Sequence, residues 1–73
     1  MQTYEVDDVL DLCDDIIDLC DDMPDSEAAD DFKESVMEKV VSIRQHVEDL
    51  ERFSDKQLQT LLNIKEGVSK WIR

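Results

Sequence analysis

Hydrophobic and polar residues recur with helical periodicity along this chain of 73 residues. Residues 6–26 form three consecutive heptads, VDDVLDL, CDDIIDL and CDDMPDS, with acid at the same three places in each. Apolar residues spaced by three and four predict an amphipathic helix. We expect this helix over residues 5–22, with Thr3 able to cap it. Met23-Pro24 ends it, because the residue before a proline avoids the helical region.

A second apolar stripe predicts a longer helix over residues 27–52. Either Asp25 or Ser26 can accept hydrogen bonds from its first-turn amides, and further acid suits the positive end of the helix dipole. The stripe consists of Ala29, Phe32, Val36, Val40, Ile43, Val47 and Leu50.

A capping box marks the start of a third helix, expected over residues 55–72. Ser54 caps this helix, Gln57 reaches back to Ser54, and Phe53 can pack onto Leu58. Gly67 is a weak point that costs about 1 kcal/mol relative to alanine. The apolar side of the helix carries Leu58, Leu61, Leu62, Val68, Trp71 and Ile72.

The two connections are short, which places neighbouring helices antiparallel. We therefore predict an all-α fold, a small antiparallel three-helix bundle that forms a single acidic helical domain over residues 1–73. The middle helix is the longest and leaves apolar residues uncovered where it extends beyond its neighbours. A homodimer is therefore possible.

Aspartates line the first helix opposite its apolar residues. At 100° per residue they fill an arc of about 140° and span about 22 Å, or one negative charge per roughly 3 Å. One strand of DNA carries one charge per roughly 3.4 Å. We call this set the acidic ridge: Asp7, Asp8, Asp11, Asp14, Asp15, Asp18, Asp21 and Asp22.

Most of the acidic residues are aspartates, whose side chain is one methylene shorter than that of glutamate. Thirteen of the 20 are Asp, which is the poorer helix former in a helix interior. Solubility alone would favour Glu. A shorter side chain holds its carboxylate closer to the backbone and loses less entropy when it is bound, which favours recognition.

The negative charge is concentrated near the amino terminus. Residues 1–31 contain thirteen acids and no Lys or Arg, whereas residues 32–73 contain seven acids and eight bases, for a net charge of −12. Such a surface repels nucleic acids and anionic membranes and suits a basic protein. We expect a basic protein partner and no direct binding to nucleic acid or membrane. An alternative is that the acid only provides solubility.

Cys13 and Cys20 lie about 10 Å apart on one helix, beyond the roughly 7 Å that a disulfide spans. We expect both to be reduced and buried. No basic, apolar leader precedes the acidic ridge, and no apolar run approaches the roughly 18 residues of a membrane span. The expected location is the cytoplasm.

Neither a cofactor nor a catalytic site is predicted. No DxDxDG calcium loop occurs, and Cys13, Cys20 and His46 do not have the spacing of zinc ligands. We interpret His46 as a residue at the boundary of an apolar stripe. Exposed carboxylate pairs lack the desolvated cleft of a general acid, and no nucleophile elbow or phosphate loop is present. We expect a non-enzyme.

Three apolar residues allow two interpretations. Leu12 and Leu19 lie where the apolar arc meets the acidic ridge, so they either pack in the core or anchor an interface with an acidic rim. Trp71 either covers the core or is an interface hot spot. We favour core packing for all three.

In composition and size the chain resembles the class of small acidic DNA mimics that phages and bacteria use against nucleases, restriction systems and CRISPR complexes. The resemblance covers the acidic first helix and does not extend to the third. It implies an inhibitor, of anti-CRISPR or anti-restriction type, that binds a basic nucleic-acid-binding protein or complex through the acidic ridge. The alternative function is a small helical adaptor or oligomeric subunit that docks through its apolar seam.

Overall fold

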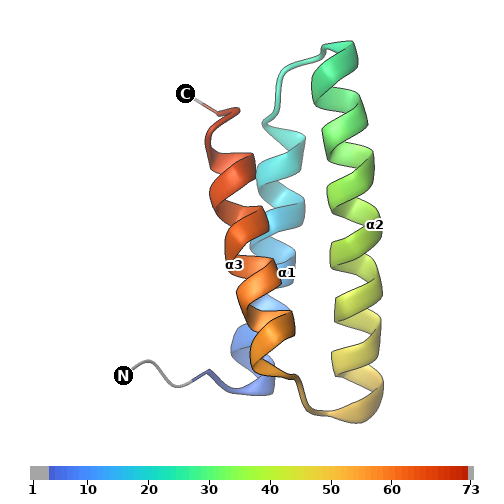
Figure 1. Cartoon of the computed structure of the whole chain (residues 1–73), viewed down its shortest axis with the longest axis vertical. Coiled ribbons are helices and arrows are strands. Elements are labelled where there is room, and N and C mark those ends of the chain that lie inside the picture. The colour runs from blue at the N-terminus through green and yellow to red at the C-terminus, as the bar shows by residue number, and fades with distance from the viewer. Residues whose placement is uncertain (1–3, 73) are drawn as a thin grey trace.

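The computed structural model describes residues 4–72, which form three α-helices joined by two short connections. The helices are α1 (Val6–Asp21), α2 (Glu27–Leu50) and α3 (Asp55–Ser69). Successive helices run in opposite directions, so the chain passes up α1, down α2 and up α3 (Figure 1). The predicted fold class, an all-α antiparallel three-helix bundle, is confirmed.

The observed α1 lies within one residue of its predicted bounds. Its N-cap is Glu5, whose backbone N–H donates a hydrogen bond of 2.9 Å to Oδ2 of Asp8. This bond satisfies one amide at the start of the helix. Thr3, the predicted cap, lies outside the described residues. The helix stops ahead of Met23-Pro24, as predicted.

Ser26 is the residue that caps α2, since its Oγ accepts a hydrogen bond of 3.1 Å from the N–H of Ala29. α2 ends at Leu50, two residues before the predicted end near Arg52. Glu51 follows in the left-handed conformation, with φ 53° and ψ 33°. This conformation costs a non-glycine residue about 1–2 kcal/mol, and it turns the chain out of the helix.

The predicted capping box at the start of α3 is confirmed. The N–H of Gln57 donates to Oγ of Ser54 at 3.1 Å, and the N–H of Ser54 donates to Oε1 of Gln57 at 3.0 Å. Two backbone amides are thereby satisfied before the helical ladder begins. The connection between α2 and α3, residues 51–54, contains neither glycine nor proline.

The predicted end of α3 at residue 72 is wrong by three residues, because the helix ends at Ser69. The N–H of Trp71 donates to the carbonyl of Val68 at 3.0 Å, so the hydrogen bond spans three residues instead of four. Such tightening is common where a helix runs out of backbone partners. The Trp71 ring then lies against Phe32 of α2, with 5.9 Å between the ring centroids.

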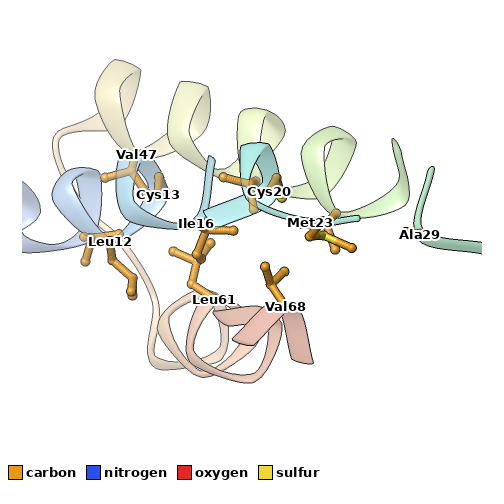
Figure 2. Close-up of a cluster of buried hydrophobic side chains, with 12 residues drawn as sticks. Leu12, Cys13, Ile16, Cys20, Met23, Ala29, Val47, Leu61 and Val68 are labelled. Atoms are coloured by element: carbon orange, nitrogen blue, oxygen red, sulfur yellow. The ribbon is translucent and has the colours of Figure 1, made fainter. Parts of the chain in front are cut away.

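One hydrophobic core lies between the three helices (Figure 2). Its centre is the inner face of α1, which packs against both neighbours, whereas α2 and α3 contact each other much less. No helix within residues 4–72 combines the length and the hydropathy needed to cross a membrane. The buried residues are Val9, Leu12, Cys13, Ile16, Cys20, Met23, Ala29, Val36, Val40, Val47, Leu61 and Val68.

Candidate functional site

The acidic ridge lies on the outer face of α1. All eight of its side chains are exposed, whereas five residues on the opposite side of the helix are buried in the core. This separation follows from the heptad pattern, because each apolar residue that turns inward leaves its acidic neighbours facing out. The prediction that these carboxylates face solvent is confirmed. Their role in binding a partner stays a prediction.

Three members of the acidic ridge have a polar partner. Asp8 accepts the hydrogen bond at the N-cap. Oδ1 of Asp14 lies 3.2 Å from Nε of Arg44 in α2, and Oδ2 of Asp15 lies 3.9 Å from Nζ of Lys65 in α3. The Asp14 and Asp15 side chains remain 56% and 63% exposed, so each ion pair contributes at most about 1 kcal/mol.

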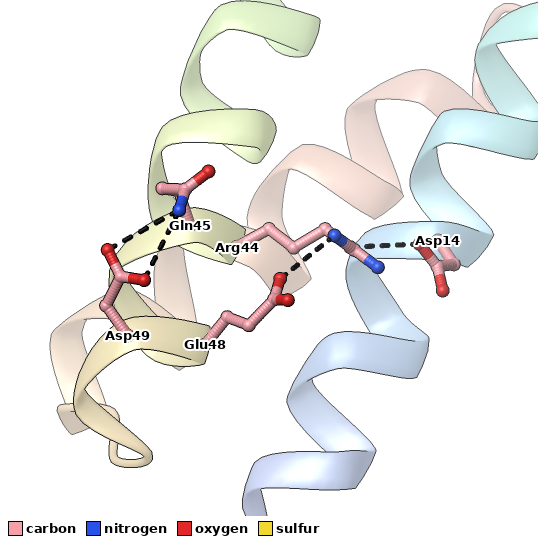
Figure 3. A network of polar contacts seen from close by, with 5 residues as sticks. All are labelled: Asp14, Arg44, Gln45, Glu48 and Asp49. Atoms are coloured by element: carbon pink, nitrogen blue, oxygen red, sulfur yellow. Dashed lines mark hydrogen bonds and ion pairs between the residues drawn. The ribbon is translucent and has the colours of Figure 1, made fainter.

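Arg44 does not neutralise Asp14 by itself. Figure 3 shows its guanidinium between Asp14 of α1 and Glu48, which lies one turn further along α2. Nη1 of Arg44 is 3.2 Å from Oε2 of Glu48. A single positive charge is therefore shared by two carboxylates, and the surface at this point stays negative.

The remaining five carboxylates have no ion pair or side-chain hydrogen bond to any residue in the described range. Asp11 and Asp18 experience the most like-charge repulsion in the acidic ridge, because each has four other ridge aspartates three or four positions away. Like charges at this spacing destabilise a helix by about 0.2–0.5 kcal/mol per pair. The five unpartnered members are Asp7, Asp11, Asp18, Asp21 and Asp22.

The acidic ridge also continues to the end of α1 where negative charge is unfavourable. Asp7 and Asp8 lie in the first turn, near the positive end of the helix dipole. Asp18, Asp21 and Asp22 lie near the negative end, and the last turn of α1 contains no basic residue. Helix stability alone would favour lysine or arginine at these positions.

A shallow hollow of about 440 Å³ lies beside the acidic ridge, between α1 and α3. Carboxylates line its edge, and two leucines contribute apolar surface. This combination matches the two parts of an arginine or lysine side chain, which has an apolar stem and a cationic end. The lining residues are Tyr4, Asp8, Asp11, Leu12, Asp15, Leu62 and Lys65.

The three apolar residues that allowed two interpretations, Leu12, Leu19 and Trp71, pack in or against the core, as predicted. Leu12 is only 6% exposed, and Leu19 is half-buried against the core. Trp71 is also half-buried there, in contact with Phe32. The charged face of α1 is therefore backed by packed leucines and is not interrupted by a large exposed apolar side chain.

Cys13 and Cys20 are free thiols on the buried inner face of α1, as predicted. Burial raises the pKa of both thiols above the ordinary value of 9.0. The positive charge of Arg44 opposes this shift for Cys13, and that of Lys33 opposes it for Cys20. Both thiols are neutral at pH 7, which leaves them poor nucleophiles.

Metal-binding side chains do not gather anywhere within residues 4–72, where no three His, Cys, Asp or Glu form a group able to hold an ion. His46 is exposed on α2 and lines a hollow together with Ile43, which agrees with a position at the edge of an apolar stripe. The chemistry that the carboxylates of the acidic ridge offer is the binding of cationic groups.

Sequence reasoning missed the basic partners of Asp14 and Asp15. Arg44 is 30 residues away from Asp14 along the chain, and Lys65 lies on another helix altogether. The periodicity of one segment fixes which of its residues face outward, but not which long side chains reach across from a neighbouring helix. A signal was nevertheless present, because Arg44 directly follows the apolar residue Ile43 and therefore sits at the edge of the α2 stripe.

Comparison of the chain with protein-family models, with curated proteins and with solved structures gave no match. Function is therefore inferred from the charge and geometry of the molecule itself. The acidic ridge is the basis of that inference, because the like charges around Asp11 and Asp18 and the acid at the carboxyl end of α1 are unfavourable for the helix that displays them.

Proposed function

We propose that the chain is a non-catalytic acidic protein that binds the basic nucleic-acid-binding surface of a partner protein in place of DNA or RNA. The observation that carries this proposal is the row of eight exposed aspartates, five of them without a polar partner within residues 4–72. Their spacing of one charge per roughly 3 Å is close to that of a nucleic acid strand.

Binding uses the contacts that a phosphate-binding groove already offers. Arginine holds carboxylate and phosphate oxygens with the same pair of parallel hydrogen bonds. Because aspartate is short, the ridge carboxylates keep well-defined positions and lose little entropy on binding. The hollow beside Asp11 receives one such arginine or lysine, whose stem packs on Leu12 and Leu62.

A protein that fills such a groove excludes the nucleic acid and inhibits whatever the partner does with it. We therefore assign the chain to inhibitors of a host defence nuclease complex, of anti-CRISPR or anti-restriction type, encoded by a phage or another mobile element. The small size of the chain suits this role, because a competitor needs a charged surface and no active site.

The unfavourable position of the acid supports recognition over mere solubility. Acid that only keeps a protein soluble is effective anywhere on the surface. Here it is concentrated on one helix, where the like charges around Asp11 and Asp18 and the acid at the carboxyl end both weaken that helix. Features that reduce stability are typical of functional surfaces.

Charge reversal on the acidic ridge tests the proposal. The ridge variant is Asp11→Lys, Asp15→Lys and Asp18→Lys. It is compared with a control, Asp31→Lys, Glu34→Lys and Glu66→Lys, in which three other exposed acids undergo the same change of charge. Each protein is immobilised and used to capture basic proteins from a lysate of the cells that carry the gene. Circular dichroism verifies that both variants remain helical.

We expect the ridge variant to lose capture and the control to retain it. Capture by the wild type should weaken steeply as salt is raised, because ion pairs with exposed carboxylates are screened. Equal capture by both variants would contradict the proposal.

The adaptor alternative makes the opposite prediction about salt. A subunit that docks through its apolar seam assembles equally well at low and high salt, since burial of apolar surface does not depend on screening. Sedimentation at both salt concentrations separates the two. A salt-insensitive dimer that captures no basic protein would favour the adaptor, and a monomer that captures a nucleic-acid-binding protein would favour mimicry.

A further inference from the structure

A groove follows the seam between α2 and α3, on the side of these helices that α1 does not cover. It consists of three adjoining hollows of about 620, 370 and 340 Å³, which share Ile43, Lys39 and Thr60 along their borders. Along α2 it extends from Phe32 to Leu50, a distance of about 27 Å. We call it the α2–α3 groove. It exists because these two helices contact each other so much less than either contacts α1.

Partly covered apolar side chains line the α2–α3 groove. Ile43 and Phe53 are half-buried at one end, and Ile64 is half-buried at the other. Leu50 is 47% exposed, which makes it one of the two most exposed large apolar residues in the described part of the chain. This surface is apolar enough to pack against a further helix, as in a four-helix bundle.

The edges of the α2–α3 groove are basic. Lys39, Arg52 and Lys56 line it, and none of them has an ion pair with another described residue. Glu38 is the only acid that lines it. In a chain with a net charge of −12, three bases are thus left without acidic partners along one groove. These three bases are exposed, so they are available to pair with acids on another molecule.

This charge pattern selects the kind of molecule that fits. A second copy docked here by two-fold symmetry would bring three more bases into the interface, with Glu38 as the only acid that lines the groove of either copy. A polynucleotide would be repelled by the strongly negative chain as a whole. An amphipathic helix with acidic edges provides apolar contacts for the floor and carboxylates for the bases. Such a helix carries far fewer charges than a polynucleotide, so the acidic chain repels it less, and salt at physiological concentration screens that repulsion over about 8 Å.

We propose that the α2–α3 groove binds an amphipathic helix of a partner protein, about 18 residues long, with an apolar stripe between two acidic edges. The bound helix becomes the fourth helix of the bundle. This site is separate from the acidic ridge and does not depend on the function proposed for it. One chain then binds a basic surface through α1 and an acidic helix through α2 and α3.

Two designed peptides test the proposal. Both have 18 residues and the same leucine stripe, and the residues beside the stripe are glutamate in one peptide and lysine in the other. Each is titrated into the ¹⁵N-labelled full chain at physiological salt, and the amide shifts of the chain are followed by NMR. We expect the glutamate peptide to shift amides along the α2–α3 groove and to leave α1 unchanged.

Single charge reversals then locate the contact. Lys39→Glu and Lys56→Glu should each weaken binding of the glutamate peptide by at least about tenfold, since each reversal replaces an attraction with a repulsion. Lys70→Glu is the matched control, because Lys70 is an exposed lysine that lines none of the three hollows. The Lys70→Glu variant should bind the glutamate peptide as tightly as the wild type does.

Several results would overturn the proposal. One is that the glutamate peptide fails to bind, or shifts amides of α1 instead. Another is that the lysine peptide binds the α2–α3 groove equally well. A third is that dilution of the chain alone moves the groove amides, which would show that a second copy occupies the site. Shifts of the groove amides on addition of duplex DNA would equally contradict it.

Discussion

The inner and outer faces of α1 come from the same heptads, yet they contribute to the protein in opposite ways. The inner face supplies five buried residues around which both other helices pack. The outer face displays eight carboxylates, most of them without a partner in the described chain, and its like charges oppose helix formation. The fold depends mainly on the inner side of α1, because within the described residues the outer side contributes only the N-cap hydrogen bond of Asp8 and two exposed ion pairs. The other side is free to serve binding.

The largest expected effect concerns the inner face. Ile16 is fully buried, so Ile16→Ala should lower the free energy of unfolding by about 2–5 kcal/mol through lost burial and the cavity that remains. Urea denaturation followed by circular dichroism measures this change. Asp15→Ala, at the adjacent outward position, should change stability by less than about 1 kcal/mol. Equal losses for the two variants would remove the distinction between the faces.

The outer face should respond with the opposite sign. Asp11→Asn and Asp18→Asn each remove four like-charge contacts, so each should raise the free energy of unfolding by about 1 kcal/mol at low salt. The gain should shrink as salt is added, because the repulsion is screened. Thermal unfolding at two salt concentrations measures it. A loss of stability would mean that these carboxylates support the fold after all.

Raising the pH perturbs the inner face without a substitution. The pKa values of Cys13 and Cys20 are raised by burial, so the folded state keeps its thiols protonated where the unfolded chain releases the protons. The stabilising effect of the neutral thiols is complete below pH 9 and is lost as the pH rises through the folded pKa. At pH 9.5 the loss is less than about 1 kcal/mol per thiol.

The pH dependence has a simple control. The variant Cys13→Ala and Cys20→Ala has no thiols, so its stability profile should lack this alkaline decline, whatever its stability at pH 7. Urea titrations between pH 7 and pH 10 compare the two proteins. If the decline were equally steep in the variant, the thiols would not be its cause.

The smallest effect is expected where the two faces meet, at the ion pair between Asp14 and Arg44. The Asp14 side chain is 56% exposed, and Arg44 is 38% exposed and also contacts Glu48. A double-mutant cycle with Asp14→Ala and Arg44→Ala should therefore give a coupling of about 0.5 kcal/mol or less. A coupling above about 2 kcal/mol would show that the acidic ridge is tied into the fold at this point.

Much of the fold follows from local sequence patterns. The heptads predict which side of α1 is exposed, since a helix has a fixed angle per residue. The capping box at Ser54 predicts the first residue of α3, because Ser54 and Gln57 satisfy each other's amides whatever the remainder of the chain does. The candidate site can also be predicted from one segment of the sequence, because all residues of the acidic ridge belong to α1 and its C-cap.

The predictions from sequence depart from the structure where contacts between helices determine the conformation. α2 ends early because Glu51 adopts a left-handed conformation, which propensity does not predict for a glutamate. α3 ends early in a tightened turn from which Trp71 contacts Phe32 of α2. Two further features depend on the distances between helices. These are the pairing of the acidic ridge with basic residues of α2 and α3, and the existence of the α2–α3 groove. A single helix pattern carries no information about that separation.

Competition with nucleic acid tests the central claim most directly. The basic protein captured by the immobilised chain is titrated with duplex DNA and with single-stranded RNA, and the protein released is measured at several salt concentrations. If the acidic ridge occupies a phosphate-binding surface, one of the two nucleic acids should displace the chain completely, with the affinity of the captured protein for the chain falling as salt rises. Binding of nucleic acid to the captured protein while the chain remains attached would contradict the claim.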